Sequence, residues 1–224
     1  MSKKEVAKRY ILFIISLFFA ALGVAFTKHG ELGVSPISSV ANVMSIKFPA
    51  VSMGTWLIIW NCILIAGQVV ILRRSFQLIQ LLQVPLSFLF GWFTDLGMII
   101  VSFIPAETYA VRLTMVVVGV VVLGFGISLA VIANVIMNSG EAFVKAVSDK
   151  LKKDFGNVKI AFDVFCVVIS LVLSLIFFDM TIVGAREGTV IAALFTGVVV
   201  KLFRSILKEP VDSVLRDKAS QKNI

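Results

Sequence analysis

Acidic side chains within apolar sequence are the groups best suited to do chemistry in this chain. Asp95 lies inside the run FLFGWFTDLGMII, and Asp163 lies near the start of another apolar run. A carboxylate at the centre of a membrane helix costs about 2.5–3.5 kcal/mol on insertion scales. Asp95 is therefore expected to face a protein interior or water, as a proton or cation site. It could instead lie nearer the outer surface or bond to a neighbouring helix, and both alternatives stay open.

Two short patterned segments, 34–48 and 138–151, offer a second kind of chemistry. In the first, apolar residues recur at helical spacing, Ser35 is a good N-cap, and Pro36 suits the first helical position. The second opens with Asn138-Ser139-Gly140-Glu141, which resembles a capping box. Free N–H groups at a helix N-terminus can hold an anionic group. Glu141 is read as a cap or as a ligand-binding side chain.

The candidate substrate-binding residues share polarity or small size and a place at these helix starts, inside apolar runs, or before the last run. They are Ser35, Pro36, Ser38, Asn61, Asp95, Ser139, Gly140, Glu141, Asp163, Arg186 and Glu187. Asn61 has a packing alternative, because hydrogen bonds between membrane helices contribute about 0.6 kcal/mol. Asp163 has an alternative at a helix N-terminal dipole, and Arg186-Glu187 form either a surface anchor or a vestibule.

No other residue pattern indicates catalysis. The chain lacks a nucleophile–base pairing, metal-ligand spacing and a phosphate-binding loop, and it contains one histidine, His29, in a polar loop. Cys62 and Cys166 both lie in apolar runs and are expected to be packing residues. We therefore expect no enzyme activity, no metal and no cofactor.

Composition indicates a membrane protein, because 59% of the 224 residues are hydrophobic, 15% are charged and the mean hydropathy is +1.02. Six apolar segments are long enough to cross a bilayer, at about 20 residues per span. They are approximately 10–27, 54–72, 78–104, 111–134, 158–178 and 189–207. The third contains Pro85, so a kink or tilt is expected there.

The basic residues indicate the orientation of these spans. With the N-terminus inside, the inner side receives 17 of the 21 Lys and Arg residues, and the outer side receives the other 4. Those on the outer side are Lys28, Lys47, Arg112 and Arg186. Both termini are therefore predicted to be cytoplasmic. This one-sided distribution explains the net charge of +8 without nucleic acid, and no nucleic-acid partner is expected.

An internal repeat is visible when the sequence is shifted by 102 residues. Gly54 then matches Gly156 and Asn61 matches Asp163, and each half has the order span, short helix, span, span. Because each half has an odd number of spans, the second is expected to be inverted relative to the first. The predicted fold is an all-α membrane protein with six transmembrane helices in two inverted three-helix repeats. Each repeat has a short extra amphipathic or re-entrant helix. The boundaries are 1–107, 108–208 and a cytoplasmic tail at 209–224.

Two short motifs add a resemblance to a known family. Gly33-Val34-Ser35-Pro36 follows the first span, and Arg186-Glu187-Gly188-Thr189 opens the last. Together with the order of the spans, these motifs indicate that nearly the whole chain resembles the YczE/YyaS/YitT family. The resemblance implies a multi-pass protein of the bacterial inner (cytoplasmic) membrane, and it implies no settled substrate and no catalytic residues.

The leading functional hypothesis is a small secondary transporter or permease for a small solute, with an anionic solute as one candidate. The solute site is expected between the halves, near the N-termini of the two short helices. The alternative is a non-transporting membrane scaffold or a substrate-capturing subunit of a larger complex. The lipid bilayer is the expected partner, and a homo-oligomer stays open.

Overall fold

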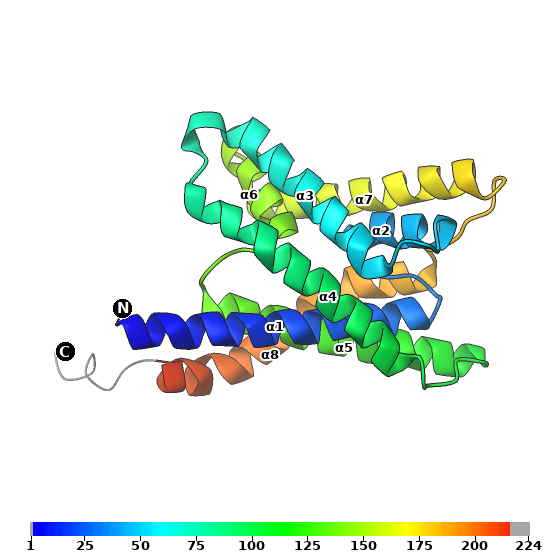
Figure 1. Ribbon diagram of the computed structural model, residues 1–224, viewed down its shortest axis with the longest axis horizontal. Helices are drawn as coiled ribbons and strands as arrows, with labels where there is room; N and C mark the ends of the chain where they lie inside the picture. Colours follow the sequence, from blue (N-terminus) through cyan, green and yellow to red (C-terminus); the bar gives the residue numbers. More distant parts are fainter. Residues whose placement is uncertain (1, 216–224) are drawn as a thin grey trace.

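The computed structural model describes residues 2–215, and all regular secondary structure in this part of the chain is helical (Figure 1). Eight α-helices and two short 3-10 helices follow one another in this part of the chain. They are α1 (Lys3–His29), α2 (Pro36–Lys47), α3 (Met53–Leu72), η1 (Arg73–Ser75), η2 (Leu78–Leu82), α4 (Gln83–Val101), α5 (Tyr109–Ala133), α6 (Ser139–Leu151), α7 (Phe155–Phe177) and α8 (Glu187–Leu215).

Six of these segments are long and apolar enough to cross a membrane, which confirms the six spans expected from the sequence. They are α1, α3 with η1, η2 with α4, α5, α7 and α8. Large apolar side chains on their outer faces stay uncovered by protein: Ile63 is 54% exposed and Leu194 is 64% exposed. Such faces suit contact with lipid. Helix α8 includes residues 209–215, and residues 216–224 of the expected tail lie outside the described residues.

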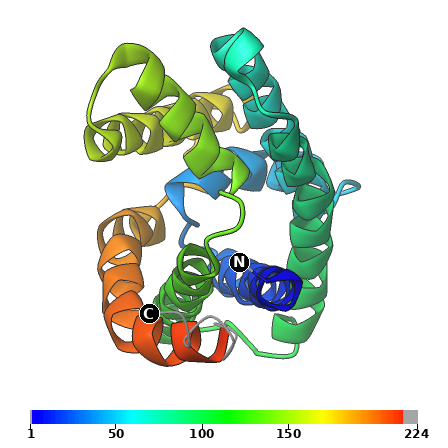
Figure 2. The ribbon, with the colours of Figure 1, turned by 90° about the vertical axis from the view of Figure 1, so that its left-hand side faces the viewer.

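Helices α1 and α5 pack along each other and lie between α4 and α8 (Figure 2), and they are the most buried of the six candidate spans. A Cβ atom on Gly23 would lie 2.7 Å from the carbonyl oxygen of Gly119, so the two backbones approach as closely as small residues allow. Helix α4 packs on the other side of α1, and α8 packs on α5. Gly23 and Gly119 therefore allow the first and second halves of the chain to pack closely.

The two short helices meet at their N-termini near the middle of the molecule. A Cβ on Gly140, in the first turn of α6, would collide with the side chain of Ile37 in the first turn of α2. From this contact the helices run outward in opposite directions, with α2 against α7 and α6 against α3 (Figure 1). Each short helix thus packs mainly on a long helix from the other half of the chain.

The start of α1 and the end of α8 lie at the same end of the molecule (Figure 1). Arg9 joins the helices there: its guanidinium pairs with Glu5 at 3.1 Å and with Asp212 of α8 at 3.2 Å. It also donates hydrogen bonds of 3.2 Å to the carbonyl oxygens of Ile132 and Ala133, at the end of α5. A single half-buried cation therefore ties together the ends of three helices.

Candidate functional site

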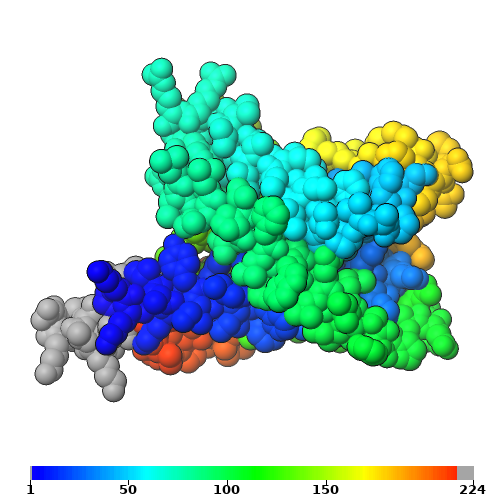
Figure 3. Space-filling view, in the orientation of Figure 1, coloured from blue at the N-terminus to red at the C-terminus, as the bar shows by residue number. Residues whose placement is uncertain are grey.

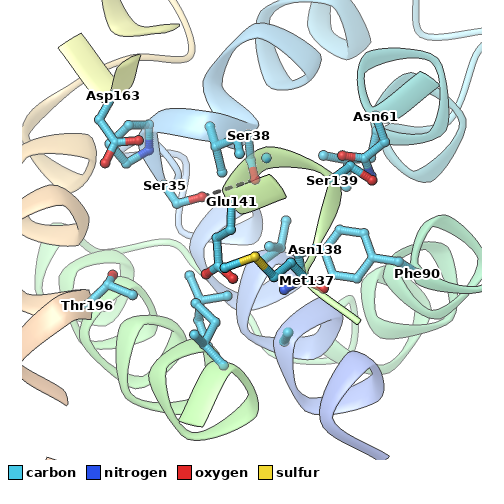
Figure 4. Close-up of a pocket in the computed structure, with 18 of the residues that line it drawn as sticks. Ser35, Ser38, Asn61, Phe90, Met137, Asn138, Ser139, Glu141, Asp163 and Thr196 are labelled. Atoms are coloured by element: carbon cyan, nitrogen blue, oxygen red, sulfur yellow. Dashed lines mark hydrogen bonds between the residues drawn. The ribbon is translucent and has the colours of Figure 1, made fainter. Parts of the chain in front are cut away.

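A cavity of about 450 Å³ lies where the N-termini of α2 and α6 meet (Figure 4). Its wall is formed by parts of α1, α3 and α5, by the first half of α4, and by faces of α7 and α8. This volume falls within the range of roughly 300–1,000 Å³ that is usual for small-molecule sites. Most of the lining is apolar, and the polar groups gather around the starts of the two short helices.

The start of α2 is held in place by the two motifs that drew attention in the sequence. Gly33 has φ +110°, and a Cβ there would lie 2.9 Å from the backbone nitrogen of Thr189. The Gly188 N–H also donates to the carbonyl oxygen of Leu32 at 2.7 Å. The glycine therefore lets the chain turn back from the end of α1 against the start of α8. Ser35 follows this turn and lines the cavity.

The start of α6 is held by a buried polar cluster. Gln68 of α3 and Gln83 of α4 exchange side-chain hydrogen bonds of 3.0 and 3.2 Å. Gln68 also donates to the carbonyl oxygen of Ser139 at 3.0 Å, and the Ser139 hydroxyl lies 3.2 Å from that of Ser87. Because buried amides and hydroxyls are costly without partners, this cluster fixes α6 relative to α3 and α4.

Neither short helix is capped by its N-cap side chain, contrary to the sequence expectation. Ser35 and Asn138 hold the N-cap positions, but neither side chain bonds to the first turn of its helix. Instead, the Ser35 hydroxyl donates to the Ser38 hydroxyl at 3.0 Å (Figure 4). Both helix starts border the cavity, so their polar side chains face it.

The Glu141 side chain extends from the first turn of α6 into the cavity (Figure 4). The residue is half-buried at the cavity wall, and its carboxyl group has no hydrogen-bond or ion-pair partner among the residues that the structure describes. Burial raises the pKa of this carboxyl group, Lys159 lowers it, and Asp163 raises it further. Glu141 is therefore a half-buried acid whose charged form lacks a protein partner.

Lys159 and Asp163 lie one turn apart on α7 and form an ion pair beside the cavity. Their charges cancel, so Glu141 is left as the unbalanced charge of the lining. In Figure 4, Asp163 of α7 and Thr196 of α8 lie on one side of the cavity, and Asn61 of α3 and Phe90 of α4 lie on the other.

Most of the sequence-predicted candidate residues come together at this cavity. Those that line it are Ser35, Pro36, Ser38, Asn61, Ser139, Gly140, Glu141 and Asp163. Asn61 has no hydrogen-bond partner among the described residues. Their role in binding stays a prediction, because nothing here identifies a ligand.

Asp95, Arg186 and Glu187 lie away from the cavity. Asp95 accepts hydrogen bonds from the Ser52 hydroxyl at 2.6 Å and from the Gly54 N–H at 2.8 Å, at the start of α3. Of the two alternatives for Asp95, this arrangement favours the bond to a neighbouring helix, where its charge also suits the helix N-terminus. Arg186 and Glu187 pair with each other at 3.1 Å and are partly exposed.

The sequence analysis missed several cavity residues. Lys159 was counted only as an inner-side cation, although its spacing of four residues from Asp163 predicts an ion pair on one helix face. Thr196 stands one repeat, 102 residues, from Thr94, and this match was a usable signal. The aromatic residues Phe13, Trp60 and Phe90 carried no signal, because any apolar face of a span contains such residues.

The six candidate spans indicate a polytopic membrane protein, and a cavity lies between its helices. The chain belongs to a family of unknown function, DUF6198, whose sequence profile matches residues 7–205. No curated protein and no solved structure shows a significant match to the chain.

Proposed function

We propose that this protein is a small secondary transporter or permease for a small solute. The observation that carries the proposal is the cavity of about 450 Å³ at the meeting point of the α2 and α6 N-termini. Interrupted or short helices that meet inside a bundle are the usual place for solute sites in secondary transporters. The eight lining residues that the sequence nominated are polar or small, as a binding surface requires.

The pairing of the helices supports an inverted repeat as part of the proposal. Helix α1 packs on α4 as α5 packs on α8, and α2 packs on α7 as α6 packs on α3. The short helices also pair alike, α2 with α3 and α6 with α7. One pair of helices does not follow this correspondence between the halves: α3 packs along α4, whereas α7 and α8 have no comparable contact within the described residues. Two repeats in different arrangements are what alternating access requires.

The proposed orientation places both chain termini in the cytoplasm. The segment between α3 and α4 lies at the same end of the molecule as the start of α1 and the end of α8 (Figures 1 and 3). That segment carries Arg73 and Arg74, and the start of α1 carries Lys8 and Arg9. Basic residues at one end favour a cytoplasmic position for that end. The likeness to the YczE/YyaS/YitT family supports a bacterial inner membrane as the location.

The alternative is a non-transporting scaffold or a substrate-capturing subunit, and the two functions make different demands on the cavity. Transport requires that solute enter the cavity, whereas a scaffold only requires that the helices pack. Neither function includes catalysis, and we propose no enzyme activity. A variant that fills the cavity without disturbing the packing therefore separates them.

Gly197 offers such a variant. It lines the cavity on α8, and a Cβ there would meet no other atom within 4 Å. The experiment reconstitutes the purified chain in liposomes and measures uptake of a broad panel of labelled metabolites. Uptake by the wild type, lost in Gly197→Leu and retained in the lipid-facing control Val198→Leu, supports transport. No uptake of any solute by the wild type, or uptake equal in Gly197→Leu, refutes it.

A further inference from the structure

We propose that the cavity binds an amphipathic organic cation, with the Glu141 carboxylate as the counter-ion of its ammonium group. This inference rests on the proposed function and names the class of solute for the same cavity. It replaces the anionic solute that the helix N-termini had indicated.

The charges around the cavity are the first argument. Lys159 and Asp163 neutralise each other, which leaves the carboxyl group of Glu141 alone. A carboxylate in a largely apolar cavity is unfavourable when no hydrogen bond or ion pair compensates it, so a cation that enters the cavity would stabilise its charged form. Helix α3, which packs against α6, presents no acidic or basic side chain between Met53 and Leu72. The other charged residues of α6 are exposed and lie outside the lining.

The walls of the cavity are the second argument. Phe13, Trp60 and Phe90 line it from α1, α3 and α4, together with aliphatic side chains of α5 and α8. Aromatic faces attract alkylated ammonium groups, and the aliphatic surface suits a hydrocarbon body. A strongly hydrated inorganic cation would find too few oxygen ligands in such a wall.

The N-termini of α2 and α6 provide fewer free N–H donors for an anion than the sequence indicated. Pro36 has no N–H, and the N–H of Ser38 already donates to the carbonyl oxygen of Ser35 at 2.9 Å. The first turn of α6 carries Glu141 itself, so its negative charge already faces the positive end of that helix. An anion in the cavity would meet this carboxylate.

A shared carboxyl group makes protons and organic cations compete. When the cation enters, the O–H bond of Glu141 breaks, the proton leaves to water, and the carboxylate pairs with the ammonium group. No other reactant is needed. Because burial raises the pKa of Glu141, proton release accompanies binding over a range above the ordinary pKa of a glutamate. The facing groups Lys159 and Asp163 shift that range in opposite directions.

The test uses the purified full chain and three probes of one skeleton: benzyltrimethylammonium, the neutral phenylacetamide and the anion phenylacetate. A quaternary ammonium keeps its charge at every pH, so any pH dependence reports the protein. Binding is followed by thermal stabilisation and by tryptophan fluorescence, since Trp60 lines the cavity. The variants are Glu141→Gln, Glu141→Asp and the cavity-filling Gly197→Leu. Asp149→Asn is the matched control, because Asp149 is an exposed acid on the same helix.

The expected result is that the cation alone binds the wild type. Glu141→Gln and Gly197→Leu weaken its binding by at least about tenfold, Glu141→Asp retains part of it, and Asp149→Asn does not change it. Affinity for the cation falls about tenfold per pH unit below the pKa of Glu141, and this dependence disappears in Glu141→Gln.

Two results would overturn the inference. Binding of phenylacetate that tightens in Glu141→Gln would make the solute an anion, and cavity binding and the proposed transport function would survive. Binding of the cation that is equal in Glu141→Gln and in the wild type would remove Glu141 from the site. Failure of the transport proposal has a separate signature, which is the absence of any cavity-dependent uptake in liposomes.

Discussion

Replacing Gly197 by leucine tests the cavity most directly, because this glycine has no packing reason to be small. A Cβ at Gly197 would meet open space, whereas a Cβ at Gly91 of α4 would lie 2.6 Å from the carbonyl oxygen of Gly54. The two glycines thus look alike in the sequence but have opposite surroundings. Leucine at position 197 is expected to enter the cavity, and leucine at position 91 is expected to force α3 and α4 apart.

The magnitudes follow from these surroundings. Glycine in a helix interior is about 0.8–1.0 kcal/mol less favourable than alanine, and leucine is nearly as good as alanine. Gly197→Leu is therefore expected to raise the free energy of unfolding by about 1 kcal/mol, since nothing must move to admit the side chain. Gly91→Leu is expected to lower it by about 3 kcal/mol, because overpacking against backbone is not relieved by rotamer changes.

The assay combines thermal unfolding of the purified variants with the uptake and probe-binding measurements. We expect a rise in melting temperature for Gly197→Leu, together with loss of uptake and of benzyltrimethylammonium binding. A variant that is stable and still binds and transports would show that the solute does not occupy this cavity. A melting temperature that drops as far as in Gly91→Leu would show that α8 is packed at Gly197 in the folded protein, contrary to the structure.

Three further perturbations test other parts of the structure. Asp95→Asn should destabilise the protein by about 1.5–3 kcal/mol in thermal unfolding, since the carboxylate accepts two hydrogen bonds at the start of α3. The same variant should leave the pH dependence of uptake unchanged, as measured by uptake at a series of pH values. Arg9→Gln should cost about 2 kcal/mol in thermal unfolding, because it removes the ion pairs that the guanidinium forms with Glu5 and Asp212. The raised pKa of Glu141 contributes stability that is present at low pH and is lost as the pH rises through that pKa. The melting temperature of Glu141→Gln should therefore fall less than that of the wild type as the pH rises above the ordinary pKa of a glutamate.

The spans and the short helices could be predicted from the sequence because their signals are local. Long apolar runs specify spans by length, and helical spacing specified the segments that became α2 and α6. The sequence predicted a solute site between the halves, near the N-termini of both short helices, but it did not predict that these N-termini touch. Eight of the eleven nominated residues lie around one cavity.

The rest depended on which helix faces which, and this information is not local. Asp95 was ambiguous because its partners, Ser52 and Gly54, lie more than 40 residues earlier. The contact between Gly140 and Ile37 depends on two chain segments about a hundred residues apart. The Gln68–Gln83 pair holds α6 in place, yet each glutamine alone reads as an interfacial residue near the end of a span.

The difference between Asp95 and Gly197, which correspond under the 102-residue shift, connects the proposed repeat to the proposed mechanism. Asp95 fastens α4 to the start of α3 by two hydrogen bonds, whereas Gly197 can form no such bond between α8 and α7. If hydrogen bonds hold α3 and α4 together while none joins α7 and α8 at the corresponding position, α3 and α4 would stay fixed relative to each other. Helices α7 and α8 would then move relative to α3 and α4. Because Lys159 and Asp163 on α7 face the cavity, a movement of α7 toward α8 would change the surroundings of Glu141. Solute binding and helix movement would thus be coupled through the same carboxyl group.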